Sequence, residues 1–393
     1  MTMSNNLKTI EAADNNNEHY IDPQLKELRH YLHQNPEVSW QEFKTAEYMI
    51  EYYKENFQPD DIIRLGGHGI AFIFNGKEDG KTVLIRTELD ALPIHEINNF
   101  AHKSKTDGVS HKCGHDGHMT MVAGVAKHFA QNRPQKGRIV LLPQPAEETG
   151  DGAKAVFEDP DFEKVKPDIA FSLHNVPGYE MHEIRCKTHS FTPAVKSMII
   201  TLQGKTAHAA KPETGINPAL AIADIIKAND KANTSSPDGS VSTLVHTIVG
   251  EKAYGISAGY GEVHITMRGR SNDDLQALWD QVSNDAKVAA KENELEISFD
   301  STEEFMANMN DEEATEMIRI AAKDCGFDYV EMDVPNPWGE DFGYITSNIK
   351  GAMFGLGSGV TNPDLHNPDY DFPDEIIETG KSMFVHLIDQ ALA

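Results

Sequence analysis

Short apolar runs alternate with amphipathic stretches over much of the chain, and each run ends at a cluster of polar residues. The runs are too short for ordinary helices, and they have the apolar character of buried strands. The clearest lie at residues 69–75, 81–94, 137–148 and 167–175. Between the second and the third, residues 117–132 have the apolar spacing of a helix. Buried strands that alternate with helices predict an α/β fold with a mostly parallel central sheet and helices on both faces.

The pattern changes in the middle of the chain. Residues 194–205 and 260–270 alternate between apolar and polar positions, as strands with one exposed face do. Residues 217–232 and 272–293 have the spacing of amphipathic helices, and from about Ser298 the first pattern returns. A small α+β module therefore interrupts the larger one. The predicted parts are a flexible N-terminal arm at residues 1–20, a larger domain formed by residues 21–185 and 298–393, and an inserted domain at residues 186–297.

Length and charge narrow the functional classes. The chain has 393 residues, more than one hydrophobic core normally covers, which also favours two domains. No apolar run approaches the ~20 residues that span a bilayer, so we expect no membrane insertion. Lys and Arg number 35 against 62 Asp and Glu, which gives a net charge of −27. Because such a field repels phosphate backbones, we expect no nucleic-acid partner.

The N-terminal residues and the cysteines indicate the compartment. The polar, Asn-rich start of the chain contains no apolar segment of the kind found in secretion signals. The three cysteines, Cys113, Cys186 and Cys325, are odd in number and far apart, which argues against a disulfide framework. The cytoplasm is therefore the expected location.

The densest cluster of polar residues is HKCGHDGH at residues 111–118. It contains metal ligands two residues apart in Cys113 and His115, a glycine that permits a sharp turn, and Asp116, a carboxylate that can orient an imidazole. The alternative is a polar loop with chance histidines, since the chain has 18 of them. So many ligand types in one short segment favour a metal-binding loop.

A pair of carboxylates, Glu147 and Glu148, ends the segment of residues 137–148, after the apolar run at residues 138–143. Adjacent side chains on an extended chain project to opposite sides, so one carboxylate can bind a metal while the other transfers a proton. A glutamate pair alone is more often a solvated edge. Its position directly after an apolar strand favours a chemical role.

Two further histidines complete a set of candidate ligands. His174 ends a predicted strand and His366 lies in a loop punctuated by Pro, although either residue alone is more often a surface or capped histidine. Together with Cys113, His115 and Glu148 they make five ligands, too many for one tetrahedral ion with an open position, so two divalent ions fit better. A thiolate favours zinc, whereas the carboxylate and histidines also accept manganese, cobalt or nickel.

A resemblance to a known family runs nearly from end to end of the chain. It is carried by LRHYLHQNPEVSWQEFKTAEYM, TELDALPIHE, HKCGHDGH, QPAEETGDGAKAV, SLHN, GKTAHAAKPETGINPALA, WGEDFGYI and LHNPDYDFPDE. The chain resembles the co-catalytic metallo-amidohydrolases, a family that includes hippurate hydrolase, N-acyl-amino-acid deacylases, N-acetyldiaminopimelate deacetylase and auxin-conjugate hydrolases.

The resemblance implies roles for individual residues. It implies two divalent ions, with manganese or zinc as the family's usual metals, and Glu147 as general base. It implies that Asp116 and His118 are supporting residues and that His208 contacts the substrate or the oxyanion. The inserted domain is expected to be a lid and dimerisation domain, so a homodimer is expected. The implied metal ligands are Cys113, His115, Glu148, His174 and His366.

These features predict a hydrolase that removes an acetyl or aroyl group from an N-acyl amino acid. Two cations lower the pKa of a bridging water from about 15.7 toward ~7. Glu147 then takes the proton of that water and delivers it to the leaving nitrogen. His208 lies in the insert, so it must reach the metals by lid closure or from a second subunit. The alternatives are a dipeptidase or carboxypeptidase with the same metal chemistry and a metal- or ligand-binding relative without catalysis.

The insert departs from the family pattern at one position. Many relatives have an Asn-x-Ile-Pro segment before a lid strand that ends in Arg, whereas the segment that begins at Gly255 reads GISAGYGEVHITMR and lacks that Asn. Arg268 ends the strand and is expected either to pair with a substrate carboxylate or to form a surface ion pair. Asn217 is expected to cap a helix, with substrate contact as the alternative. The sequence therefore leaves the acyl group and the amino-acid side chain open.

Overall fold

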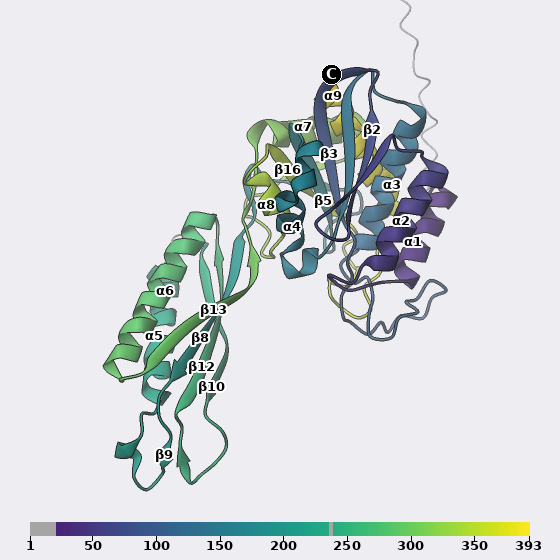
Figure 1. Ribbon diagram of the computed structural model, residues 1–393. Coiled ribbons are helices and arrows are strands. Elements are labelled where there is room, and N and C mark those ends of the chain that lie inside the picture. Colours follow the sequence, from purple (N-terminus) through teal and green to yellow (C-terminus); the bar gives the residue numbers. More distant parts are fainter. Residues whose placement is uncertain (1–20, 236–238) are drawn as a thin grey trace, which may run out of the picture.

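The computed structural model describes residues 21–235 and 239–393, and the predicted N-terminal arm at residues 1–20 lies outside them. The described residues form a large α/β part and a smaller part that extends away from it (Figure 1). Each part has a sheet and a hydrophobic core of its own.

An eight-stranded sheet lies at the centre of the large part. Its strands are β1 (Asp61–Leu65), β2 (Gly69–Asn75), β3 (Glu78–Glu88), β4 (Lys136–Gln144), β5 (Ile169–Val176), β6 (Ile184–Cys186), β15 (Tyr329–Glu331) and β16 (Gly351–Gly357). They lie in the order β1-β2-β4-β3-β5-β16-β6-β15. The four central strands, from β4 to β16, run parallel, and antiparallel pairs occur toward both edges.

Helices cover both faces of this sheet (Figure 1). One face packs against α1 (Pro23–Gln34), α2 (Phe43–Asn56), α3 (His115–Gln131), α7 (Glu312–Cys325) and α9 (Ile377–Leu392), and the other packs against α4 (Gly152–Glu158) and α8 (Phe342–Thr346). Burial on both faces explains why all eight residues of β5 are buried and why the central strands read as continuous apolar runs. The structure confirms the predicted α/β fold with a mostly parallel central sheet.

The small part is a four-stranded antiparallel sheet with two helices on one face. Its strands lie in the order β10 (Val241–Val249), β12 (Tyr260–Gly269), β8 (Ala194–Gln203) and β13 (Glu296–Phe305), and its helices are α5 (Ala219–Ser235) and α6 (Asn272–Glu292). Alternate residues of β12 are buried, because one face of the strand packs under the helices and the other is open. The strand β13 continues past the predicted boundary at Ser298, and its polar end carries no apolar signal.

Two short strand pairs mark the two ends of the small part. Near the large part, β7 (His189–Thr192) pairs with β14 (Asn308–Asn310), so the two chain crossings lie side by side. At the far end, β9 (Ala207–His208) pairs with β11 (Ile256–Ser257) (Figure 1). The chain thus leaves and re-enters the large part at one place.

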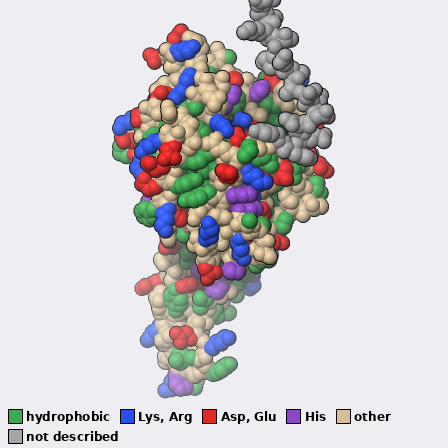
Figure 2. Space-filling view, turned by 90° about the vertical axis from the view of Figure 1, so that its right-hand side faces the viewer, with side chains coloured by type: hydrophobic (Ala, Val, Ile, Leu, Met, Phe, Trp, Pro, Cys, Tyr) green, Lys and Arg blue, Asp and Glu red, His purple; other side chains and the backbone are tan. Residues whose placement is uncertain are grey.

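The surface of the molecule is strongly charged. Acidic and basic side chains are scattered over the face in Figure 2, with hydrophobic side chains between them. On this face, therefore, the acidic excess of the composition is spread out and forms no single patch. Within residues 21–235 and 239–393, no helix is both long and apolar enough to cross a membrane.

Candidate metal centre

The predicted ligands come together at the carboxyl ends of the central strands, where open α/β sheets place their sites. His174 lies near the end of β5, and Glu148 lies in the short 3-10 helix Glu147–Thr149 just after β4. Cys113 and His115 flank the start of α3, and His366 comes from the loop after β16. Parallel strands thus bring four distant segments to one edge of the sheet.

Gly114, between the first two ligands, has a backbone that only glycine fits. Its φ is +98°, a left-handed conformation, and a Cβ placed there would lie 2.5 Å from Oδ1 of Asn175. Glycine therefore lets α3 begin directly against β5, and His115 enters the site as the first residue of that helix.

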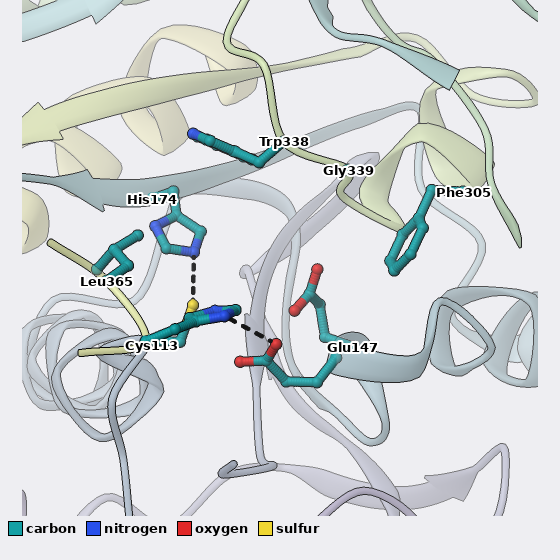
Figure 3. A pocket seen from close by; sticks show the side chains of 9 residues that line it. Cys113, Glu147, His174, Phe305, Trp338, Gly339 and Leu365 are labelled. Carbon is teal, nitrogen blue, oxygen red and sulfur yellow. Dashed lines mark hydrogen bonds and ion pairs between the residues drawn. The ribbon is translucent and has the colours of Figure 1, made fainter. Parts of the chain in front are cut away.

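The distances between the ligand atoms suit metal ions. Two ligands of one tetrahedral ion, each about 2.0–2.3 Å from it, lie roughly 3.3–3.8 Å apart. The Sγ of Cys113 lies 3.4 Å from Nε2 of His174 (Figure 3). Nε2 of His366 lies 3.6 Å from Oε2 of Glu148, and Nε2 of His115 lies 3.9 Å from Oε1 of Glu148. The candidate groups Cys113–His115–His174 and Cys113–Glu148–His366 share the thiol, as two neighbouring ions with a common ligand would require.

Buried atoms without a partner provide a test of this fit. Among the described residues, Nε2 of His115 and Oε1 of Glu148 are buried and have no hydrogen-bond partner. Unpaired buried polar atoms are costly, and natural proteins rarely retain them without a ligand or an ion. These two atoms face each other at a distance too long for a hydrogen bond, so the residues fit divalent cations.

Backbone carbonyl groups orient two of the imidazoles. Nδ1 of His115 donates to the backbone oxygen of Asp90 at 2.8 Å, and Nδ1 of His174 donates to that of Asn175 at 2.8 Å. A carbonyl oxygen only accepts, so Nδ1 must carry the proton in both rings. In the neutral form of each ring, Nε2 then carries the lone pair and is directed into the site, as metal binding requires.

Glu147 lies beside the candidate ligands in a cavity of about 350 Å³ (Figure 3). Its Oε2 lies 3.7 Å from Nε2 of His115. Burial, together with the nearby carboxylates of Glu340 and Glu148, raises the pKa of Glu147 well above its usual range. The residues that line the cavity are Cys113, Glu147, Glu148, His174, Phe305, Trp338, Gly339, Leu365 and His366.

Without cations, the site strongly disfavours the charged forms of several groups. Burial and the charge of Glu148 raise the pKa of the Cys113 thiol well above its usual range, and burial raises the pKa of Glu148 itself to about 7. A divalent cation reverses both effects, because it stabilises a thiolate and a carboxylate. The centre thus holds buried acidic groups that favour their neutral forms on their own and that bound cations would stabilise as a thiolate and a carboxylate.

Asp116 and His118 point away from the cavity. Asp116 accepts from Nδ1 of His33 at 2.7 Å, on the far side of α3. Nδ1 of His118 lies 2.7 Å from Oε2 of Glu88, and its Nε2 lies 2.5 Å from Oδ1 of Asn175. Neither residue lines the cavity, and their supporting role remains a prediction.

Three further candidates, all in the small part, do not line the cavity. His208 is exposed in β9, at the far end of that part (Figure 1). Oδ1 of Asn217 accepts from the backbone N–H of Ala219 at 2.9 Å, the contact expected of a cap for α5. Nε of Arg268 donates to the backbone oxygen of Pro337 at 3.2 Å, so Arg268 joins the small sheet to the segment that carries Trp338.

The structure also reveals a buried charge network that the sequence predictions missed. Arg86 is fully buried and contacts Glu88, Asp341 and, at 3.0 Å, Oε1 of Glu340. Oδ2 of Asp90 accepts from the N–H of Glu148 at 3.0 Å, which fixes the loop that carries the two glutamates. Glu88 ends β3 and Asp90 follows it, so these two carboxylates lie at the carboxyl end of a strand, as the predicted ligands do, and this position could have indicated their importance.

Comparison with known proteins identifies the family. The family model for peptidase family M20/M25/M40 matches residues 84–390 of the chain. The chain belongs to this family. The M20 chain is 30% identical to N-acetyldiaminopimelate deacetylase from Listeria monocytogenes serotype 4a over 376 residues, which is 92% of this chain and 98% of that protein. It is 27% identical to hippurate hydrolase from Campylobacter jejuni over 372 residues, or 93% and 95% of the two chains.

Solved structures agree with this assignment. The Bacillus subtilis YXEP protein, described as a dinuclear metal binding peptidase of the M20 family, matches with a TM-score of 0.81 and 25% identity. The match covers 94% of this M20 chain and 98% of that chain. The resemblance stated from the sequence motifs is confirmed, and so is the prediction that the protein is an amidohydrolase.

Proposed function

We propose that this M20 protein hydrolyses the amide bond of N-acyl amino acids with two divalent ions. The observation that carries the proposal is the set of inward-facing ligand atoms beside a carboxylate, Glu147, that belongs to the same cavity. The names of the two relatives support the substrate class, since one is a deacetylase of an N-acetylated amino acid and the other hydrolyses hippurate, which is N-benzoylglycine. The proposed ligands are Cys113, His115, Glu148, His174 and His366.

The protein's own groups have distinct tasks in this proposal. When bound, the ions acidify a water molecule and polarise the scissile carbonyl. Glu147 takes a proton from the attacking water and returns it to the leaving nitrogen, and its carboxylate lies in the cavity for this purpose (Figure 3). His115 and His174 keep the rotation that directs Nε2 into the site, because backbone carbonyls accept the protons of their Nδ1 atoms.

His208 is proposed to donate to the developing oxyanion, as the sequence motif implies. It is exposed and far along the small part, so it must arrive by rotation of that part or from a second copy of the chain. Either movement would also exclude water from the cavity. Asn217, by contrast, is engaged at the start of α5 through Ala219 and is proposed to act as a helix cap.

The edge strand β10 is the proposed dimer contact. It forms one edge of the small sheet, carries no Asp, Glu, Lys or Arg, and has exposed apolar residues that include Val245 and Ile248. Edge strands are normally protected by charge, as the opposite edge β13 is by Glu296, Asp300, Glu303 and Glu304. A Val245→Lys variant is expected to be monomeric in light scattering where the wild type is dimeric, whereas a Ser301→Lys variant on β13 should remain dimeric. A monomeric wild type would refute this part of the proposal.

Metal-free protein reloaded with zinc, manganese, cobalt or nickel provides the main test. We expect acetate or benzoate release from N-acetyl and N-benzoyl amino acids with at least one metal, and loss of this activity in chelator. Cleavage of free dipeptides alone would point to a dipeptidase instead. Full activity in strong chelator would reject the metal-dependent mechanism.

A further inference from the structure

The cavity has an apolar side that the proposed chemistry does not use. Phe305, Trp338 and Leu365 line it opposite or beside the ligands (Figure 3). The ring of Trp338 lies 5.1 Å from that of His174, whereas Phe305 lies on the side of Glu147. A cavity of about 350 Å³ is far larger than an acetyl group, so a small substrate would leave these apolar side chains in contact with water.

A β-bulge directs Phe305 toward this cavity. From Glu296 to Thr302, β13 pairs regularly with β8, but the register then shifts, so that Phe305 pairs with Val195. Two residues of β13, Glu303 and Glu304, thus face one residue of β8. Glu303 has φ +53°, a conformation that non-glycine residues rarely adopt.

The bulge changes the face on which Phe305 lies. Phe299, on the same strand, packs on the helix side of the sheet, where Nζ of Lys287 lies 5.4 Å from its ring centre. Residues an even number apart share a face of a regular strand, so without the bulge Phe305 would also face the helices. The extra residue moves its ring to the open face, which meets the large part at this end.

Side-chain contacts hold both residues of the bulge. Oε2 of Glu303 accepts from Oγ of Ser197 at 3.1 Å, and Oε2 of Glu304 lies 3.0 Å from Nζ of Lys196. The bulge is therefore fixed on both sides of the sheet. Bulges that re-aim a side chain are over-represented next to active sites.

Two glycines of the large part accommodate the ring. A Cβ on Gly150 would lie 3.1 Å from Cε1 of Phe305, and a Cβ on Gly339 would lie 3.0 Å from its Cδ2. Gly150 directly follows the helical turn of Glu147 and Glu148, and Gly339 follows Trp338. The ring of Phe305 is thus packed between two loops. One carries the proposed base, Glu147, and the other carries Trp338, the second aromatic residue of the cavity lining.

From this placement we propose that Phe305 is a specificity-determining residue that contacts a flat, apolar group of the amide substrate. The proposal rests on the proposed function and extends it to a substrate class: amides with an aromatic group near the scissile bond. A ring that packing already holds in place loses little conformational entropy when a ligand binds. Two aromatic rings in edge-to-face or offset contact also attract each other beyond the effect of the buried area. The flat group can belong to the acyl side or to the amino-acid side, and the experiment distinguishes the two.

The test compares kcat/KM ratios for matched substrates in the wild type and in Phe305→Ala. The acyl arm uses N-benzoylglycine against N-acetylglycine, and the amino-acid arm uses N-acetylphenylalanine against N-acetylalanine. We expect the aromatic preference to fall about tenfold or more in one arm, which identifies the side that carries the flat group. Phe305→Leu, which keeps an apolar side chain but has no flat ring, should give a kcat/KM ratio between those of the wild type and Phe305→Ala. If the alanine variant does not fold, the leucine variant decides whether Phe305 sets the aromatic preference.

Phe299→Ala is the matched control, because it removes the same ring from the same strand on the opposite face. Its ratios should stay within about twofold of the wild type. Ratios in the Phe305 variants that also stay within twofold in both arms would overturn the proposal.

A binding readout separates this inference from the proposed function. N-benzylglycine and N-ethylglycine lack the scissile carbonyl, and calorimetry gives their dissociation constants without turnover. N-ethylphenylalanine and N-ethylalanine provide the same comparison for the amino-acid side. If the wild type hydrolyses none of the four substrates, the proposed function fails, and the ratios of the dissociation constants in these two pairs then decide the role of Phe305. A ratio that falls in Phe305→Ala but not in Phe299→Ala, in either pair, supports that role, and ratios that stay unchanged in both pairs reject it.

Discussion

The two parts of the molecule differ in how deeply their polar side chains are buried. In the large part, Arg86, Glu88 and Glu340 are buried to 1% exposure or less, and Arg86 contacts both carboxylates directly. In the small part, the predicted functional residue His208 is exposed, and the edge strand β10 leaves most of its side chains in solvent. The large part therefore holds charged side chains away from water, whereas the small part exposes its polar side chains on the surface.

This difference indicates where the chemistry must lie. Buried charges cost several kcal/mol each unless partners or cations compensate them, so a protein retains such a cluster only where it serves a purpose. Exposed groups pay no desolvation cost, and only the fold of the small part holds them in position. The large part would thus supply the reacting groups, and the small part would supply contacts that form when it moves or pairs.

The largest expected effect comes from Glu147→Gln. This change keeps the shape of the side chain but removes its ability to take a proton, so kcat should fall by about 10²–10⁴-fold. Elemental analysis should still find both metals, since Glu147 is not a proposed ligand. A matched control is Glu163→Gln, an exposed residue in a surface ion pair with Lys166. Wild-type turnover in Glu147→Gln would remove this residue from the base role.

Metal retention should depend on Cys113. A serine hydroxyl is not ionised at neutral pH, so Cys113→Ser should lose a ligand that both candidate groups share and bind metal at least about tenfold more weakly. Cys325→Ser, outside the cavity and only half-buried, should bind metal as the wild type does. Metal content is measured after dialysis against a weak chelator. Equal retention in both variants would exclude Cys113 as a ligand.

Removal of the cation of the buried network should lower the stability of the fold more than removal of the cation of a surface ion pair. Arg86→Met leaves Glu88, Glu340 and Asp341 without their cation, which should cost about 3–5 kcal/mol in the free energy of unfolding. The exposed pair of Lys54 with Glu51, 3.2 Å apart, is the comparison, and Lys54→Met should cost less than about 0.5 kcal/mol. Urea unfolding gives both values. Similar costs would contradict the contrast between the two environments.

The pH dependence of stability offers a smaller test. Burial by itself lowers the pKa of His33, but the carboxylates of Asp116 and Glu96 outweigh burial and raise it to about 9. In the unfolded chain the pKa is about 6.5, so the charged ring stabilises the fold fully below that pH, and this contribution disappears as pH rises through about 9. The stability difference between wild type and His33→Gln should therefore shrink by about 2–3 kcal/mol between pH 6 and pH 10. A difference that is constant with pH in urea unfolding would show that the fold does not raise the pKa of His33.

Much of the fold and of the candidate centre could be predicted from the sequence. Apolar runs such as residues 169–176 read as buried strands because both of their faces are covered. Polar residues directly after such strands converge because parallel strands end at one edge. This rule brought Glu148 and His174 together in the prediction without any knowledge of distances.

Other features could not be predicted. The partners of Arg86 at positions 340 and 341 are far away in the sequence and have no periodic relation to it. Phe305 faces the cavity only because one extra residue shifts a strand register, and the polar sequence around Glu303 gives no sign of that shift. The position of His208 depends on how the small part extends from the large one, which local patterns do not specify (Figure 1).

The sequence by itself determined the fold class and the chemical types of the candidate ligands, because periodicity and residue chemistry are local properties. Only the tertiary structure decided which atoms face each other, which charges are buried together and which face of β13 carries Phe305. Those outcomes depend on contacts between distant segments and on strand register, where a shift of one residue reverses the direction of every side chain that follows.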